Sequence, residues 1–149
     1  MLNFYMHTRR GNRANDYEMK NKILIVDDTE TMRLYQQLLL SELGYEVEVA
    51  EDGVSGLAMI AENKPDLVLL DIMMPRMDGI ECCRKIKEDD QTRDIKVVMV
   101  TTKSEYERVR EAFAAGCDDY VTKPIDKTEL ITKVQELLDF QNLRQLLRP

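Results

Sequence analysis

The chain alternates five times between a short apolar run and a longer stretch whose apolar residues follow helical spacing. The apolar runs lie at 22–26, 45–49, 67–70, 95–100 and 119–121. Short connections between such alternating elements favour right-handed crossovers and a parallel sheet with helices on both faces. With 149 residues, the chain is long enough for one domain of this kind. No other feature of the sequence restricts the fold as strongly.

The composition of each run predicts its place in the sheet. The runs at 22–26, 67–70 and 95–100 are almost wholly apolar, as expected for strands buried on both faces. Glu46 and Glu48 alternate with apolar residues in the second run, and the fifth run is short, so both strands are expected at the edges. We therefore predict an α/β fold, a flavodoxin-like, doubly wound, five-stranded parallel sheet in the order 2-1-3-4-5 with five helices.

Apolar residues at three- and four-residue steps predict which helix faces cover the sheet. The first two helical stretches carry Met32, Tyr35, Leu38, Leu39 and Leu43, and then Leu57, Met59, Ile60 and Ala61. The third and fourth carry Ile80, Cys83 and Ile86, and then Tyr106, Val109, Ala112 and Phe113. The last carries Leu130, Val134, Leu137 and Leu138. Gly44 and Gly116 follow two of these stretches and are expected to end the helices.

Three parts of the chain differ in character. Residues 1–21 have no periodic apolar face and are interpreted as a flexible N-terminal arm. The only histidine, His7, lies in this arm and is expected to be a plain surface residue. Residues 22–138 form the predicted domain. For residues 139–149 we expect a C-terminal helical extension, although a fraying tail fits the sequence equally well.

Composition excludes several classes of function. The net charge of −7 opposes direct binding to nucleic acids or anionic membranes. No apolar run approaches the roughly 20 residues needed to cross a bilayer, so we expect no membrane insertion.

The cysteines show neither disulfide nor zinc-ligand spacing; they are Cys82, Cys83 and Cys117. We expect a cytoplasmic protein with reduced thiols, in which Cys83 and Cys117 are core residues and Cys82 is half-exposed.

Carboxylates follow the first and third predicted strands. Asp27 and Asp28 follow the first strand, and Asp71 ends the third. The predicted order makes these strands neighbours, so the three side chains should share the crevice at the carboxyl edge of the sheet. Carboxylate oxygens in an open site suit Mg²⁺. Each Asp taken alone is equally consistent with a turn or a helix cap.

A hydroxyl, a backbone N–H and an ammonium are expected at the same edge. Thr101 and Thr102 end the fourth strand, and Lys123 with Pro124 follows the fifth. Phosphoryl transfer requires such groups around an aspartate, because its negative charge spreads over three oxygens. Singly, Thr101 could be a β-branched strand end and Lys123 a solvated side chain.

Four segments at the strand ends carry a specific resemblance. They are IVDD at 25–28, LLDIMMPRMDG at 69–79, VMVTT at 98–102 and DYVTKP at 119–124. This ordered set closely resembles the receiver domain of bacterial two-component response regulators, over about residues 22–138. The resemblance implies a phosphorylation-activated signalling switch in which Asp71 accepts a phosphoryl group from a sensor histidine kinase or a phosphotransfer protein. Such a protein is not an enzyme beyond its own phosphotransfer and slow autodephosphorylation.

The resemblance also implies a metal site. Asp28 and Asp71 would bind Mg²⁺ directly, together with the backbone carbonyl of Met73. Asp27 would act largely through water.

Further roles concern phosphoryl binding and switching. Thr101 and Lys123 would hold phosphoryl oxygens, assisted by the N–H of Thr102, with a cis peptide bond between Lys123 and Pro124. Thr101 and Tyr120 would form the switch, although Tyr120 could simply pack an edge strand against a helix. The switching surface implied comprises the fourth helix, the fifth strand and the fifth helix. It would bind an unknown downstream protein or form a homodimer.

Two residues depart from the best-known chemotaxis pattern. In that pattern, polar and acidic groups at the positions of Met73 and Lys103 help to place the hydrolytic water, so their replacement suggests a long-lived phosphoryl group.

An alternative class of protein is the Mg²⁺-dependent phosphatases with an aspartate nucleophile. In those enzymes, however, the nucleophile and a second acid occupy alternate positions after the first strand. A nucleotide- or flavin-binding module fits poorly, because the first loop is acidic where a phosphate cradle requires glycines.

Overall fold

The computed structural model describes residues 20–147, and these form a five-stranded parallel sheet in the order β2-β1-β3-β4-β5. The strands are β1 Lys22–Val26, β2 Glu46–Ala50, β3 Leu67–Asp71, β4 Lys96–Thr101 and β5 Asp119–Thr122. The helices are α2 Glu30–Ser41, α3 Gly53–Glu62, α4 Gly79–Glu88, the 3₁₀ helix η2 Lys103–Arg108, α5 Val109–Ala114 and α6 Lys127–Leu146. The predicted fold class and strand order are confirmed.

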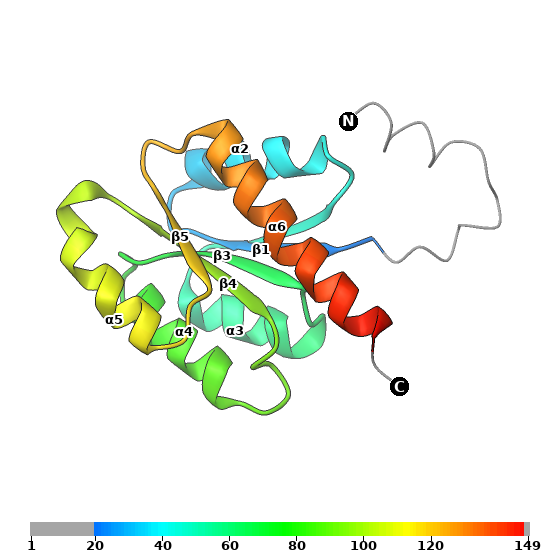
Figure 1. Cartoon of the computed structure of the whole chain (residues 1–149). Coiled ribbons are helices and arrows are strands. Elements are labelled where there is room, and N and C mark those ends of the chain that lie inside the picture. Colours follow the sequence, from blue (N-terminus) through cyan, green and yellow to red (C-terminus); the bar gives the residue numbers. More distant parts are fainter. Residues whose placement is uncertain (1–19, 148–149) are drawn as a thin grey trace.

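Helices cover both faces of the sheet, with α2 and α6 on one side and α3, α4 and α5 on the other (Figure 1). Side chains of each central strand alternate between two apolar layers. On β1, Ile23 and Ile25 pack in the layer that contains Leu130 of α6. Leu24 and Val26 pack in the opposite layer. Because β1, β3 and β4 are buried on both faces, their polar residues are confined to the strand ends, where the candidate site lies.

Aspartates begin three of the helices. Asp52, Asp78 and Asp126 each accept a hydrogen bond from the backbone N–H three residues later, at 2.7, 2.9 and 2.9 Å. These side chains satisfy donors that the first helical turn leaves unpaired. Asp78 therefore fixes the start of α4 directly after the loop that follows Asp71.

Two predicted apolar faces were partly wrong. On α2, Tyr35 and Leu38 are 41% and 56% exposed, whereas Gln36 is buried. The Nε2 of Gln36 donates to the carbonyl of Met32 at 3.0 Å, which satisfies one polar end of the buried side chain, whereas its Oε1 has no hydrogen-bond partner among the described residues. The covered face of α2 therefore includes a polar residue that apolar spacing does not predict. In the fourth helical stretch, Tyr106 and Phe113 are 60% and 46% exposed. The cause is that residues 103–108 wind as a 3₁₀ helix, which shifts the spacing of the buried face.

Cys82 is buried and not half-exposed as predicted. α4 contacts both α3 and α5, so a wide part of its surface is covered and Cys82 lies within it. Cys83 and Cys117 are buried, as expected for core residues. Burial raises the pKa of the Cys82 thiol to about 12 and that of Cys83 to about 11, which makes both thiols poor nucleophiles.

The last helix, α6, continues to Leu146, well past the part that contacts the core. Phe140, Leu143 and Leu146 in this part are more than half exposed. Residues 1–19, including His7 and most of the expected arm, lie outside the described residues. Among residues 20–147, no helix combines the length and apolar character needed to span a bilayer.

Candidate functional site

Strand pairing brings the predicted carboxylates together at the carboxyl edge of the sheet. Val26 of β1 pairs with Leu70 of β3, so the next residues, Asp27 and Asp71, lie side by side. Together with Asp28 they offer carboxylate oxygens that all lie within 4.8 Å of one another. Asp27 and Asp71 are buried, whereas Asp28 is exposed. The result is an acidic pocket that is open on one side.

Lys123 supplies the positive charge in this pocket. Its Nζ lies 3.2 Å from Asp71 Oδ2 and 3.6 Å from Asp27 Oδ2. The backbone fixes its position, because the N–H of Lys123 donates to the carbonyl of Thr101 at 2.7 Å. The Lys123–Pro124 peptide bond is cis, as the resemblance implied.

Burial and charge set the ionisation of the pocket. Burial, aided by the negative charge of Asp27, outweighs the opposing effect of Lys123 and raises the pKa of Asp71 to about 6. Burial alone would lower the pKa of Lys123, but the Asp71 and Asp27 carboxylates outweigh it and raise that pKa. At neutral pH, Asp71 is therefore a carboxylate held beside an ammonium, although it ionises less readily than an exposed aspartate.

The carboxylates fit a hard divalent cation. Asp27 Oδ1 accepts a hydrogen bond from the N–H of Thr29 at 2.8 Å. Asp27 Oδ2 is buried and has no hydrogen-bond donor among the described residues. Lys123 Nζ compensates this oxygen only at an ion-pair distance of 3.6 Å. A buried carboxylate oxygen that accepts no hydrogen bond can accept a further cation, and oxygen-only donor sets suit Mg²⁺. The loop after Asp71 carries Met73, whose side chain is 54% exposed.

The hydroxyl and the backbone N–H expected at the end of β4 have an unforeseen partner. Thr101 is fully buried, and its Oγ1 donates to Glu105 Oε2 at 3.2 Å. The N–H of Thr102 points to the same oxygen at 3.5 Å. The sequence did carry a signal for part of this contact, because Thr102 to Glu105 reads T-x-x-E, the pattern of a helix capping box.

Tyr120 belongs to an exposed aromatic cluster. Its ring packs edge-on against Tyr106 and Phe113, with centroids 6.5 and 6.1 Å apart. The Nζ of Lys133 lies 4.9 Å from the centre of the same ring and also donates to the Tyr120 carbonyl. Tyr120 thus joins η2, α5 and α6, the elements of the expected switching surface.

Sequence reasoning also missed Arg108. Its Nη2 donates to Asp78 Oδ2 at 2.8 Å, and its Nη1 lies 3.8 Å from Met73 Sδ. Arg108 lies at the end of η2, whereas Asp78 precedes α4, so the ion pair ties η2 to the loop after Asp71. No local pattern predicts a contact between residues 30 positions apart.

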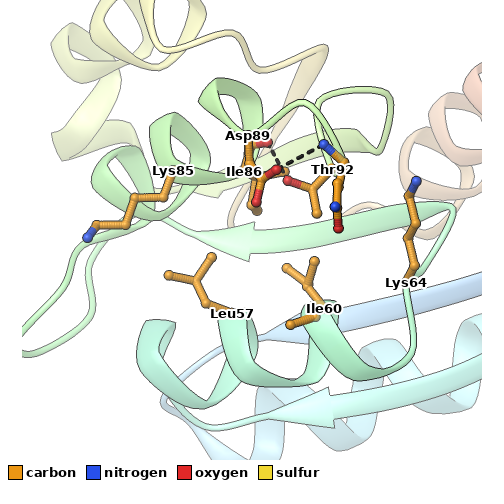
Figure 2. A pocket seen from close by; sticks show the side chains of 9 residues that line it. Leu57, Ile60, Lys64, Lys85, Ile86, Asp89 and Thr92 are labelled. Atoms are coloured by element: carbon orange, nitrogen blue, oxygen red, sulfur yellow. Dashed lines mark hydrogen bonds between the residues drawn. The ribbon is translucent and has the colours of Figure 1, made fainter.

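Two clefts lie away from these groups. One, of about 490 Å³, lies between α3 and α4, with Leu57 and Ile60 pointing into it (Figure 2). The other, of about 370 Å³, lies at the amino ends of β3 and β4. Its lining includes five basic side chains brought together from separate segments, although the sequence showed no basic patch. They are Lys64, Lys87, Arg93, Lys96 and Arg144. Lys87 and Lys96 face Asp118 at 3.0 and 3.8 Å, which offsets much of this charge.

Fold and site together define a doubly wound α/β domain with an acidic pocket and a lysine at the carboxyl edge of its sheet. A protein-family model described as the response regulator receiver domain matches residues 23–135. The chain therefore belongs to the receiver-domain family of two-component response regulators.

Named relatives and solved structures agree with this assignment. The chain is 44% identical to response regulator PleD of Caulobacter vibrioides over 124 residues, covering 83% of this chain and 27% of PleD. It is 38% identical to RpaA of Synechocystis, a DNA-binding dual master transcriptional regulator, covering 78% of this chain and 48% of RpaA. Among solved structures, the chemotaxis protein CheY4 of Vibrio cholerae has a TM-score of 0.75 at 30% identity, covering 80% of this chain and 99% of that one. The receiver domain of NtrX from Brucella abortus has a TM-score of 0.74 at 34% identity, covering 78% and 98%.

The chain spans about half or less of the length of these two curated relatives. Membership of the family supports phosphorylation-dependent signalling as its role. Receiver domains interact with histidine kinases or phosphotransfer proteins and generally bind Mg²⁺ in an acidic pocket.

Proposed function

We propose that this chain accepts a phosphoryl group on Asp71 from a histidine kinase or phosphotransfer protein and thereby changes its binding surface. The observation that carries the proposal is the position of Lys123 Nζ, 3.2 Å from Asp71 Oδ2 within a pocket of three carboxylates. Asp71 is the carboxylate nearest to this fixed cation, which suits a nucleophile that attacks an anionic group.

In the transfer, a carboxylate oxygen of Asp71 attacks the phosphorus of the donor's phosphohistidine. The phosphorus–nitrogen bond breaks, its electron pair stays on the donor imidazole, and Asp71 becomes an acyl phosphate. Lys123 and the donors of Thr101 and Thr102 hold the phosphoryl oxygens. Asp27, Asp28, Asp71 and the carbonyl of Met73 would hold Mg²⁺, which when bound neutralises charge on the transferring group.

The added charge provides the switching signal. An acyl phosphate brings a further charge of about −1.5 to −2 to the edge of the sheet. Thr101 and then Tyr120 would move inward, favouring a conformation of η2, α5, β5 and α6 that exists before modification. That surface would bind a downstream protein or a second copy of the chain.

The site favours self-modification over turnover. The alternative, a Mg²⁺-dependent phosphatase, has two acids at alternate positions after the first strand, whereas Asp27 and Asp28 are adjacent and the carboxylate nearest Lys123, that of Asp71, ends β3. Beyond its own phosphotransfer and slow autodephosphorylation, we propose no enzymatic activity. The DNA binding named for RpaA belongs to that longer protein. For residues 22–138 we propose a cytoplasmic domain that does not itself bind nucleic acid or insert into membranes.

The proposal is tested by adding beryllofluoride and Mg²⁺ to the wild-type chain and to Asp71→Asn, followed by size-exclusion chromatography and amide NMR spectra. We expect spectral changes that spread from Asp71 to Tyr120 in the wild type and are absent from the variant. A response that is identical in both proteins would refute it. Steady release of phosphate from a small phosphate monoester would instead favour the phosphatase.

A further inference from the structure

Glu105 occupies the donors that an acyl phosphate on Asp71 would need. Its Oε2 lies 3.2 Å from Thr101 Oγ1 and 3.5 Å from the N–H of Thr102. Thr101 is fully buried, and a hydrogen that it or the Thr102 N–H directs at Glu105 is not directed at a phosphoryl oxygen on Asp71. The hydroxyl of Thr101 is further shared with the carbonyl of Thr102 at 3.2 Å.

We propose that Glu105 is an anionic placeholder, which occupies the phosphoryl-binding donors in the unphosphorylated chain and is displaced when Asp71 is phosphorylated. This inference rests on the proposed function, because it takes the donors of Thr101 and Thr102 as phosphoryl ligands.

Competition between the two anions follows from donor capacity and charge. A threonine hydroxyl and a backbone N–H each offer one hydrogen. The Glu105 carboxylate and the phosphoryl group are both negative, so placing them on the same donors adds repulsion to the loss of hydrogen bonds. Glu105 therefore lowers the affinity of the pocket for a phosphoryl group and stabilises the unmodified state.

Displacing Glu105 would also affect the aromatic cluster. The contact of Glu105 with the N–H of Thr102 closes the first turn of η2. A 3₁₀ helix has poor internal hydrogen-bond geometry and depends on such end contacts. The next residue is Tyr106, whose ring packs against Tyr120. Release of Glu105 thus links occupancy of the phosphoryl site to the position of Tyr106.

The test compares Glu105→Gln with the matched control Glu107→Gln. Both variants remove one negative charge from η2, but among the described residues the carboxylate that accepts from Thr101 Oγ1 and the Thr102 N–H is that of Glu105 and not that of Glu107. Gln at position 105 keeps the length and an acceptor oxygen, so the cap can persist. Beryllofluoride is titrated at fixed Mg²⁺ and fluoride, and the bound fraction is measured by ¹⁹F NMR.

We expect Glu105→Gln to bind beryllofluoride about three- to tenfold more tightly than the wild type, as expected from removing one nearby like charge. Glu107→Gln should match the wild type. Equal or weaker binding by Glu105→Gln, or an equal gain in both variants, would overturn the placeholder role. If the wild type shows no Asp71-dependent binding, the proposed function itself fails. Glu105→Ala, which also removes the cap, should gain affinity as well.

Discussion

At the residue scale, the site is a balance between burial and charge at Asp71. Burial disfavours its carboxylate, and Lys123 at 3.2 Å compensates only in part, so the pKa rises from 3.8 to about 6. The raised pKa means that the folded chain takes up a proton at Asp71 more readily than the unfolded chain does. Ionising Asp71 therefore lowers the free energy of unfolding. The ionised carboxylate is also the form that would act as the nucleophile.

The first prediction concerns the stability of Asp71→Asn in metal-free buffer. The contribution of Asp71 to stability is fully present below pH 4 and is lost as pH rises through about 6, because the folded-state pKa is the higher one. Asp71→Asn removes the cost of ionisation, so its free energy of unfolding should exceed that of the wild type by roughly 1–3 kcal/mol at pH 7.5. The advantage should shrink toward pH 4.

Urea denaturation at several pH values measures this difference. Asp139→Asn provides the control, because it makes the same charge change at an exposed position on α6. An advantage of Asp71→Asn that does not vary between pH 4 and 7.5 would contradict the assignment of the raised pKa to Asp71.

A second prediction concerns the lifetime of the phosphoryl group. The Met73 side chain is exposed at the loop after Asp71, and Lys103 is exposed at the start of η2, so neither offers an acid or amide to place water. Met73→Asn with Lys103→Glu should speed dephosphorylation about 3- to 10-fold by orienting the attacking water. Phosphate release after labelling measures the rate, with Lys127→Glu as the control for charge. An unaltered rate would show that these positions do not set the lifetime.

At the scale of elements, the start of α4 limits the geometry of the loop. A Cβ on Gly79 would overlap the carbonyl oxygen of Asp71, and Gly79 N–H donates to the carbonyl of Ile72 at 2.8 Å. Gly79→Ala must therefore move α4 or the end of β3, at an expected cost of about 2 kcal/mol or more in the free energy of unfolding.

Gly53→Ala is the matched control for this third prediction, and both variants are compared by urea denaturation. Its added Cβ would lie 3.1 Å from Met77 Sδ and 3.3 Å from Met77 Cβ and Cγ, a tight contact that a small shift of this side chain can relieve. Gly53→Ala should therefore cost much less stability than Gly79→Ala. Equal stability of the two variants would mean that the approach of α4 to Asp71 is not constrained by Gly79.

The elements differ in how well sequence could predict them. Strand order followed from the apolar character of β1, β3 and β4, because strands buried on both faces leave a clear pattern. The covered face of α2 could not be predicted in this way, because it includes Gln36, whose side chain donates to the backbone of its own helix. The strand order alone was enough to predict that Asp27, Asp71 and Lys123 lie together. The contacts of Glu105 and Arg108 depend on how η2 winds and packs, which apolar spacing does not encode.

At the scale of the whole molecule, the acidic pocket should couple metal binding to folding. A ligand that binds only the folded chain raises its stability. Asp27 Oδ2, which accepts no hydrogen bond from the described residues, makes this fourth prediction specific. Millimolar Mg²⁺ should raise the melting temperature of the wild type, and excess chelator should reverse the rise. Asp27→Asn should lose most of it, whereas Asp139→Asn should keep it. An equal shift in all three proteins would place the binding elsewhere.

The central claim is that Asp71 is the phosphoryl acceptor, and intact-mass spectrometry after incubation with acetyl phosphate and Mg²⁺ tests it most directly. The wild type should gain the mass of one phosphoryl group and lose it again at alkaline pH, as expected of an acyl phosphate. Asp71→Asn should gain no mass, and a chelator should suppress labelling of the wild type. Undiminished labelling of Asp71→Asn, or no labelling of a folded wild-type chain, would contradict the account.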